Sequence, residues 1–187
     1  HSGAFLLGAH TVFILWPEAD LGIAVLTNAQ PRGLAEAIAL AFGEQALGDA
    51  VNGIPSADWL AVMQEKMHGL YRPLGRLAGQ PPPASPAPSL PLGRYAGCYA
   101  NAYYGDACVE LGAGGAALDL VLGPAQVRYR LRHQDGDLFA FDLSGENAPP
   151  GSVSAVQFSL DGLGRMQIEY YAEDLAQGLF ERVADGR

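Results

Sequence analysis

Lysine is almost absent from this sequence, because Lys66 is the only one in 187 residues. A lysine-dependent site elsewhere in the chain is therefore excluded. Lysine and arginine together number 11 against 20 acidic residues, and the formal net charge is −9. Nucleic-acid binding requires a basic surface that neutralises phosphates, so we expect no nucleic-acid partner.

Several common signatures of chemistry are also missing. The chain has no Gly-x-Ser-x-Gly elbow, no P-loop, no Gly-x-Gly-x-x-Gly fingerprint and no His-Glu-x-x-His motif. We therefore expect no cofactor. No apolar run reaches the 18 residues of a membrane span, so none is expected in this chain. The sequence starts at His1 rather than at a methionine, which indicates a boundary or a processed fragment.

Cysteine is scarce, with only Cys98 and Cys108 present. The residues between them are typical of a β-hairpin, and a three-residue loop at residues 102–104 would place the two cysteines opposite each other. A cross-strand disulfide is one interpretation if the compartment is oxidising, and two half-buried free thiols fit equally well. The spacing does not suit a metal site, because no histidine lies near.

The first 28 residues predict a β-hairpin. Residues 11–16 and 23–26 are short apolar runs, and residues 17–22 between them carry the turn residues Pro17 and Gly22. Unbroken apolar runs of this length are typical of strands that are buried on both faces. We therefore expect the hairpin to lie inside a larger sheet with a layer on either side.

Two helices are predicted next. The first has about 15 residues, with Pro31 at its first position and Gly48 as its C-cap. Its expected apolar face consists of Leu34, Ile38, Ala41, Phe42 and Leu47. The second follows Ser56 as N-cap. Its apolar stripe of Trp59, Met63, Met67 and Leu70 is interpreted as core packing rather than as a ligand face.

A proline-rich segment separates two parts of different periodicity. Residues 80–92 contain six prolines and predict an extended, semi-rigid spacer. The remaining sequence, residues 93–184, shows seven or eight short strands at roughly ten-residue spacing, as expected for an antiparallel meander closed into a small barrel or sandwich. We expect domains at 1–79 and 93–184, an α+β chain overall, and a filled barrel interior because its strands alternate large apolar residues.

One strand of the second domain is basic. Arg128, Arg130 and Arg132 alternate, so they share one face of the strand. They can bind an anionic ligand, or they can form a solvated face that is balanced by local acids such as Asp135 and Asp137. We favour the solvated face.

The opening residues HSGAFLLG, the turn and strand PEADLGIAVLTN and the helix GLAEAIALAFGEQALG resemble the end of the serine β-lactamase-like domain. That family (peptidase S12 type) includes class C β-lactamases, DD-peptidases (penicillin-binding proteins) and related esterases, and its third motif takes a His-Ser-Gly form in some members. The pattern of Gly97, Tyr99, Asn101, Tyr104, Gly105 and Asp106 is similar to the small lipocalin-like β domain appended to many of these hydrolases.

The resemblance implies a role for four residues. His1 would line the active site, Ser2 would hydrogen-bond the substrate, Gly3 would let the strand approach it, and the N–H of Ala4 would donate to the oxyanion. The family's Ser-x-x-Lys nucleophile motif is absent, since residue 63 is methionine three positions before the only lysine. Tyr99-Ala100-Asn101 matches the second family motif in letters only, because it lies downstream of the third.

We therefore predict a C-terminal portion of a serine hydrolase whose parent acts through an acyl-enzyme on an amide or ester. The portion is expected to be inert alone, and its partner would be the upstream catalytic part of the same hydrolase. The resemblance favours a periplasmic or secreted location. Two alternatives are a barrel that binds a small ligand or gates substrates, and a module for oligomerisation, with a homo-oligomer formed through residues 1–28.

Overall fold

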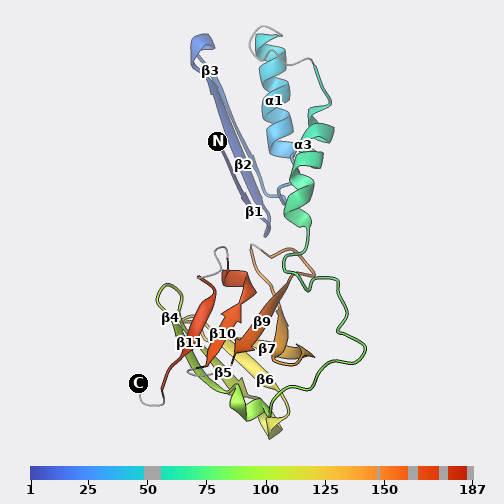
Figure 1. Ribbon diagram of the computed structural model, residues 1–187. Coiled ribbons are helices and arrows are strands. Elements are labelled where there is room, and N and C mark those ends of the chain that lie inside the picture. The colour runs from blue at the N-terminus through green and yellow to red at the C-terminus, as the bar shows by residue number, and fades with distance from the viewer. Residues whose placement is uncertain (49–55, 147, 160–163, 173–176, 185–187) are drawn as a thin grey trace. The chain divides into compact units, whose positions relative to one another are not determined.

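A computed structural model describes most of the chain. The described residues are 1–48, 56–146, 148–159, 164–172 and 177–184. The chain divides into two compact units, one of residues 1–72 with 144–150 and the other of residues 73–143 with 151–187. The first holds a three-stranded sheet and two helices, and the second holds a closed barrel (Figure 1). The predicted α+β class with an antiparallel barrel of about eight strands is confirmed.

The sheet of the first unit contains the two strands of the predicted hairpin and one further strand, β1. Its strands are β1 (Ser2–Phe5), β2 (Ala9–Trp16) and β3 (Leu21–Thr27), all antiparallel in the order β1-β2-β3. The turn between β2 and β3 is the 3-10 helix η1 (Pro17–Ala19). Within the described chain, the prediction that these strands are buried on both faces is wrong. Burial alternates along β2 because helix α1 covers one face only.

Helix α1 (Leu34–Leu47) packs on that face through small residues. Its buried positions are Ala35, Ala37, Ala39 and Gly43. The predicted apolar face is therefore wrong, and Leu34 and Ile38 are 46% and 43% exposed. The reason is steric, because a Cβ at Gly43 would lie 2.5 Å from a ring carbon of Trp16. Large side chains on the sheet leave room only for small ones on the helix.

The ends of the two helices also differ in part from expectation. Helix α1 begins after Gly33, which has a positive φ of 82°, so Pro31 precedes the helix, whereas Gly48 is the predicted C-cap. Helix α3 (Trp59–Met67) is capped by Asp58 rather than by Ser56, because the Asp58 side chain accepts a hydrogen bond from the Ala61 N–H.

Helix α3 packs against α1, and the two lie side by side in Figure 1. The indole of Trp59 is buried and donates to Oε2 of Glu44 at 2.6 Å. Met63 meets Gly33, where a Cβ would come within 2.7 Å of the methionine. Leu70, in the 3-10 helix η2 (His68–Tyr71), is 48% exposed and takes no part in the expected stripe.

The barrel of the second unit is a meander of eight antiparallel strands. Its closed order is β10-β11-β4-β5-β6-β7-β8-β9. The strands are β4 (Gly97–Asn101), β5 (Gly105–Leu111), β6 (Leu118–Leu122), β7 (Val127–Asp135), β8 (Leu138–Asp142), β9 (Val153–Ser159), β10 (Arg165–Ile168) and β11 (Leu179–Arg182). Short 3-10 helices are η3 (Leu92–Arg94), η4 (Ala113–Gly115) and η5 (Glu169–Tyr171). Closure leaves no open strand edge in the described barrel.

Large side chains fill the barrel interior, as the alternation of its strands predicts. The largest fully buried ones are Tyr95, Tyr99, Phe139, Phe141, Phe158 and Phe180, together with Leu118, Leu120, Met166 and Ile168. Tyr95 contacts the rings of Phe139 and Phe158 at centroid distances of 5.0 and 4.9 Å. A barrel of eight strands has an interior just wide enough to be filled in this way.

The proline-rich segment is attached to the barrel. Its Ala87 donates to Oδ1 of Asp135 at 2.6 Å and accepts from the Gly136 N–H at 2.9 Å. Leu90 donates to the Tyr95 hydroxyl at 2.9 Å. Residues 73–92 therefore belong to the barrel unit, which begins at Pro73.

Candidate functional site

The predicted site residues His1, Ser2, Gly3 and Ala4 lie at and in β1, the edge strand of the small sheet. All four are exposed. The ring of His1 stacks on Phe13 with centroids 6.0 Å apart and planes 12° apart. Strand β1 therefore presents the His-Ser-Gly triplet at an accessible margin of the unit.

Side chains of this triplet point to both faces of the sheet. Ser2 pairs with Val12 and Ala4 pairs with His10, so both follow the face that α1 covers. His1 and Gly3 follow the opposite face. The structure thus places the imidazole and the serine hydroxyl on opposite sides of one strand, and they share only its outer edge.

The backbone of β1 exposes donors along that outer edge. His1 and Phe13 exchange two backbone hydrogen bonds of 2.9 Å. In an antiparallel pair, residues that bond to the partner alternate with residues whose N–H and C=O point away. The N–H groups of Ser2 and Ala4 therefore point outward, where the described residues supply no further strand. An N–H so placed can donate to a carbonyl oxygen that approaches from outside.

Glycine at position 3 is not required by its neighbours in the described chain. A Cβ there would meet Oγ1 of Thr11 at 3.5 Å, which is an ordinary contact. The same hydroxyl donates to the Gly3 carbonyl at 3.5 Å. Packing within this unit therefore gives no reason for a glycine, in contrast to Gly43.

A buried pair of ionisable residues, His10 and Glu36, lies beside the triplet. The sequence motifs did not indicate it. His10 is 1% exposed, and its Nε2 lies 2.7 Å from Oε1 of Glu36 in the first turn of α1. The other carboxylate oxygen, Oε2, is buried and has no hydrogen-bond partner among the described residues. The available signal was the register of β2, where His10 falls in line with Val12 and the other core positions.

A groove lies between the helices of this unit. It has a volume of about 370 Å³ and is lined by Ala29, Gln30, Arg32, Leu34, Leu60 and Gln64. The guanidinium of Arg32 stacks over the Tyr71 ring at 4.7 Å. Burial raises the pKa of Tyr71, and the charge of Arg32 opposes that effect. The described lining residues include no acid, histidine, serine or cysteine that could act as a base or a nucleophile.

The three arginines of β7 form a solvated face, as favoured from the sequence. They pair with carboxylates on other strands of the barrel: Arg128 with Glu110 of β5 at 2.7 Å, Arg130 with Asp119 of β6 at 2.6 Å and Arg132 with Asp142 of β8 at 2.6 Å. The hydrogen bond from Arg132 lowers the pKa of Asp142, and the one to Glu110 raises the pKa of Arg128.

The acids expected to balance these arginines have other roles. Asp135 accepts from the Ala87 N–H, and Asp137 accepts from the hydroxyl of the buried Tyr95 at 2.5 Å. Burial first, and this hydrogen bond second, raise the pKa of Tyr95 to about 12. Cross-strand register, rather than proximity in sequence, decided which acids meet the arginines.

The motif that includes Tyr99, Asn101 and Tyr104 holds the β4–β5 loop. Oδ1 of Asn101 accepts from the N–H groups of Tyr103 and Tyr104, and its Nδ2 donates to the carbonyls of Gln177 and Leu179, all at 2.8–2.9 Å. The Tyr99 hydroxyl is buried and donates to the Tyr95 carbonyl. These bonds are structural, which agrees with reading Tyr99-Ala100-Asn101 as no catalytic motif.

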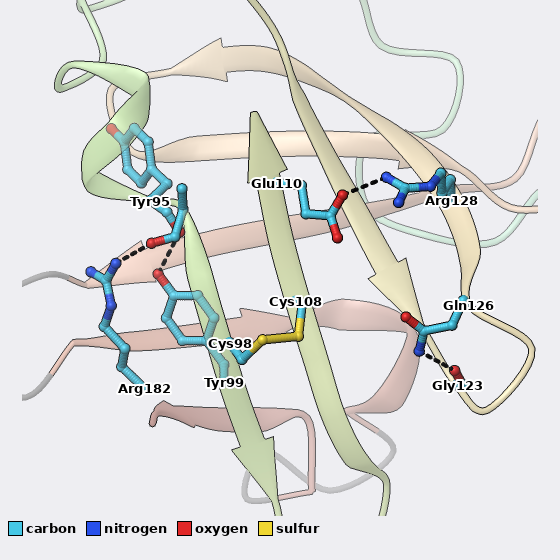
Figure 2. Close-up of a disulfide and its surroundings, with 10 residues drawn as sticks. Tyr95, Cys98, Tyr99, Cys108, Glu110, Gly123, Gln126, Arg128 and Arg182 are labelled. Atoms are coloured by element: carbon cyan, nitrogen blue, oxygen red, sulfur yellow. Dashed lines mark hydrogen bonds and ion pairs between the residues drawn. A yellow bond between two sulfur atoms is a disulfide. The ribbon is translucent and has the colours of Figure 1, made fainter. Parts of the chain in front are cut away.

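Cys98 and Cys108 form a disulfide, which settles the question that the sequence left open. They face each other in the β4–β5 register, and the loop between the strands is residues 102–104, as predicted. Figure 2 shows the bond across the two strands, with Tyr99 and Arg182 nearby. The guanidinium of Arg182 lies 5.6 Å from the Tyr99 ring centroid and donates to the Arg94 and Ala96 carbonyls.

The described residues also bear on metal ligation and on helices that could span a membrane. No group of three or more His, Cys, Asp or Glu side chains in that part of the chain is arranged to hold a metal ion. None of the described helices has the length and apolar character to cross a bilayer.

Comparison with known proteins decides the family of the barrel unit. The model of a family described as "Domain of unknown function (DUF3471)" matches residues 81–177, more than half of the chain. The chain belongs to this family. The DUF3471 match spans the proline-rich segment and strands β4–β10, so the His-Ser-Gly strand lies outside it. No curated protein matches the chain.

Among solved structures, this DUF3471 protein is similar to the C-terminal domain of penicillin-binding protein Rv0907. Sequence identity is 47%, and the match covers 56% of this chain and 96% of that domain. The TM-score is 0.49.

Proposed function

We propose that this chain is the C-terminal portion of a serine hydrolase of the β-lactamase and penicillin-binding-protein type. The observation that carries the proposal is the 47% identity with a penicillin-binding protein's C-terminal domain over 96% of that domain. The His-Ser-Gly strand and its hairpin, which precede the DUF3471 part, support the same assignment. In the parent enzyme, the reaction is acyl transfer from an amide or ester through an acyl-enzyme.

In this proposal β1 forms one wall of the active site. The outward N–H of Ala4 donates to the carbonyl oxygen of the substrate, where negative charge develops during attack. Ser2 hydrogen-bonds the substrate at the same edge, and His1 contacts it from the exposed face. Gly3 keeps the strand free of a side chain, which fits the finding that its neighbours in the chain would accept a Cβ.

The nucleophile and its base come from the upstream catalytic part of the same hydrolase. Acyl transfer needs a nucleophile, a base and oxyanion donors within hydrogen-bond reach of one another. This chain has no Ser-x-x-Lys, and Lys66 lies exposed in α3. The disulfide in the barrel fits a periplasmic or secreted location, because such bonds persist in oxidising compartments.

The first test uses the chain alone. Intact mass is measured after incubation with a fluorophosphonate probe and, separately, with a fluorescent penicillin. We expect no added mass. A stoichiometric adduct that Lys66→Ala abolishes would contradict the missing nucleophile and would assign the base to this chain.

The second test uses the full-length hydrolase that carries this segment. His1→Ala and Ser2→Ala should each lower the rate of acylation by about 10- to 1000-fold, the range found for removing one group that contacts the reacting centre. His68→Ala is the matched control, because His68 is an exposed histidine of η2 and should leave the rate unchanged. Equal rates in all three variants would remove β1 from the active site.

A further inference from the structure

Four tyrosines form a continuous row of touching rings on the barrel unit. Tyr103 meets Tyr104 edge-on with centroids 4.9 Å apart, Tyr104 stacks on Tyr171 at 4.3 Å, and Tyr171 meets Tyr170 at 5.5 Å. We call Tyr103, Tyr104, Tyr171 and Tyr170 the tyrosine row. Neither the acyl-transfer proposal nor the disulfide accounts for it.

The tyrosine row lies at one end of the barrel. Tyr103 and Tyr104 belong to the β4–β5 loop, and Tyr170 and Tyr171 belong to η5, which follows β10. In an antiparallel meander, alternate connections lie at the same end, so these two meet there with the β6–β7 turn. At the opposite end, the fully buried Tyr95 packs among the core rings and closes the interior.

Much of the row is accessible from solvent. Tyr103 is 82% exposed and Tyr170 is 39% exposed, whereas Tyr104 and Tyr171 are partly buried against the barrel core. None of the hydrogen bonds among the described residues uses the hydroxyls of Tyr103, Tyr104, Tyr170 or Tyr171. The outer rings thus offer both aromatic faces and hydroxyls to a ligand.

Both segments that carry the row are held rigidly. Asn101 makes four hydrogen bonds that fix the β4–β5 loop and join it to the start of β11. Glu169 accepts from the N–H groups of Arg76 and Ala155, and the Tyr170 N–H donates to Oγ of Ser154, which together fix η5. A surface that is already ordered loses little conformational entropy on binding.

The charge around this surface disfavours an anionic ligand. The charged residues within two positions of the row in sequence are the carboxylates Asp106, Glu169 and Glu173, and the chain carries a net charge of −9. Anionic ligands and nucleic acids are therefore repelled, although aromatic rows can stack on bases. The described core side chains fill the closed barrel, so an apolar ligand finds no room inside it. The surface can instead contact a flat ligand that has apolar faces and hydroxyl groups.

We propose that the tyrosine row binds a neutral β-linked oligosaccharide. In β-1,4-linked sugars, the axial C–H groups make each ring face apolar, while the equatorial hydroxyls project sideways. Tyrosine rings stack on the apolar sugar faces, and phenol hydroxyls hydrogen-bond to the sugar hydroxyls. Tyr104 and Tyr171 stack on each other and are partly buried, so the exposed rings are those of Tyr103 and Tyr170 at the two ends of the row. Two separate exposed rings fit an extended chain of sugar units better than a single sugar. The inference depends on the barrel unit alone and not on acyl transfer.

The test is calorimetric titration of the full chain with cellohexaose and with chitohexaose, together with NMR shift mapping. We expect binding, with shifts at residues 103–105 and 170–171. Tyr103→Ala should lower the association constant about tenfold, because an aromatic contact of this kind is worth roughly that factor. Tyr170→Phe, which removes only a hydroxyl, should lower it less.

Leu111→Ala is the matched control, since Leu111 is 46% exposed at the other end of the barrel. It should bind as the unsubstituted chain does. Tyr103 is almost fully exposed, so its loss is not expected to impair folding, and thermal unfolding of each variant verifies this. Absence of binding to both sugars, equal binding by Tyr103→Ala, or binding of a proline-rich peptide in their place would each overturn the proposal.

Discussion

The pair of His10 and Glu36 ties strand β2 to helix α1 at a buried position. Glu36→Ala removes the side-chain partner of the His10 ring and leaves a polar group buried without that hydrogen bond. We expect the free energy of unfolding to fall by about 2 kcal/mol. Urea unfolding followed by tryptophan fluorescence measures it, because both tryptophans lie in this unit.

Gln45→Ala is the control for this change. Gln45 lies on the same helix but is exposed, and its loss should change the unfolding free energy by less than about 0.5 kcal/mol. If both variants unfold alike, the buried pair contributes nothing to stability.

Tyr95 makes the barrel sensitive to alkali. Its folded-state pKa is raised to about 12 from the ordinary value of 10.0, because burial and the hydrogen bond to Asp137 favour the neutral phenol. Above pH 10 the unfolded chain therefore loses this proton while the folded barrel keeps it. The stabilisation is complete below pH 10 and is lost as the pH rises towards 12, by up to about 3 kcal/mol.

Unfolding in urea across pH 9–12 measures that loss. In Tyr95→Phe the barrel should start less stable by about 1 kcal/mol, having lost the hydrogen bonds of the hydroxyl, and should show a smaller decline with pH. Parallel declines in the two proteins would assign the alkaline sensitivity to other groups.

At the scale of elements, helix α1 packs so closely on the sheet that the usual preference for alanine over glycine in a helix is expected to be reversed at position 43. Alanine usually stabilises a helix by about 1 kcal/mol relative to glycine. At position 43, however, the added Cβ would overlap the indole of Trp16. We expect Gly43→Ala to lower the unfolding free energy by about 1–3 kcal/mol. Ala46→Ser, at an exposed position of α1, should be nearly neutral, and stabilisation by Gly43→Ala would show that α1 can move off the sheet.

The β4–β5 hairpin gains from its disulfide. Cys98 and Cys108 are separated by 10 residues in sequence, and closing a loop of that length is worth about 3 kcal/mol through the unfolded chain. Reduction with dithiothreitol should therefore lower the stability of the barrel by about that amount in urea unfolding. The double variant Cys98→Ala, Cys108→Ala should unfold like the reduced protein and should not respond to the reductant.

For the whole molecule, the uncovered face of the small sheet is the surface through which we expect copies of the chain to associate. Phe5, Phe13, Leu15 and Leu26 are 49–76% exposed on it, and β1 is an edge strand. We expect the chain alone to form a dimer or a higher assembly through residues 1–28. Sedimentation velocity at several concentrations tests this, and a mass that stays monomeric would contradict it.

A single charge should separate the copies. Leu26→Glu places a carboxylate on the exposed face and is expected to yield a monomer. Leu60→Glu, on helix α3 at 40% exposure, should leave the assembly unchanged.

Local patterns determined much of this protein. The strands of the barrel, the three-residue loop at 102–104 and the C-cap at Gly48 were predictable, because alternation and turn chemistry act over a few neighbouring residues. The position of the His-Ser-Gly triplet on a strand was expected from the family resemblance and not from the apolar pattern. Its surroundings were not, because Ser2 and His1 take opposite faces of β1 and His10 finds its partner 26 residues away.

Only the tertiary structure decided the contacts between segments that are distant in sequence. Helix α1 turns its small residues inward because Trp16 occupies the space, against the face that its apolar periodicity predicts. The β7 arginines meet Glu110, Asp119 and Asp142 through strand register. Such choices depend on the shape and register of the partner surface, which the pattern of one segment does not contain.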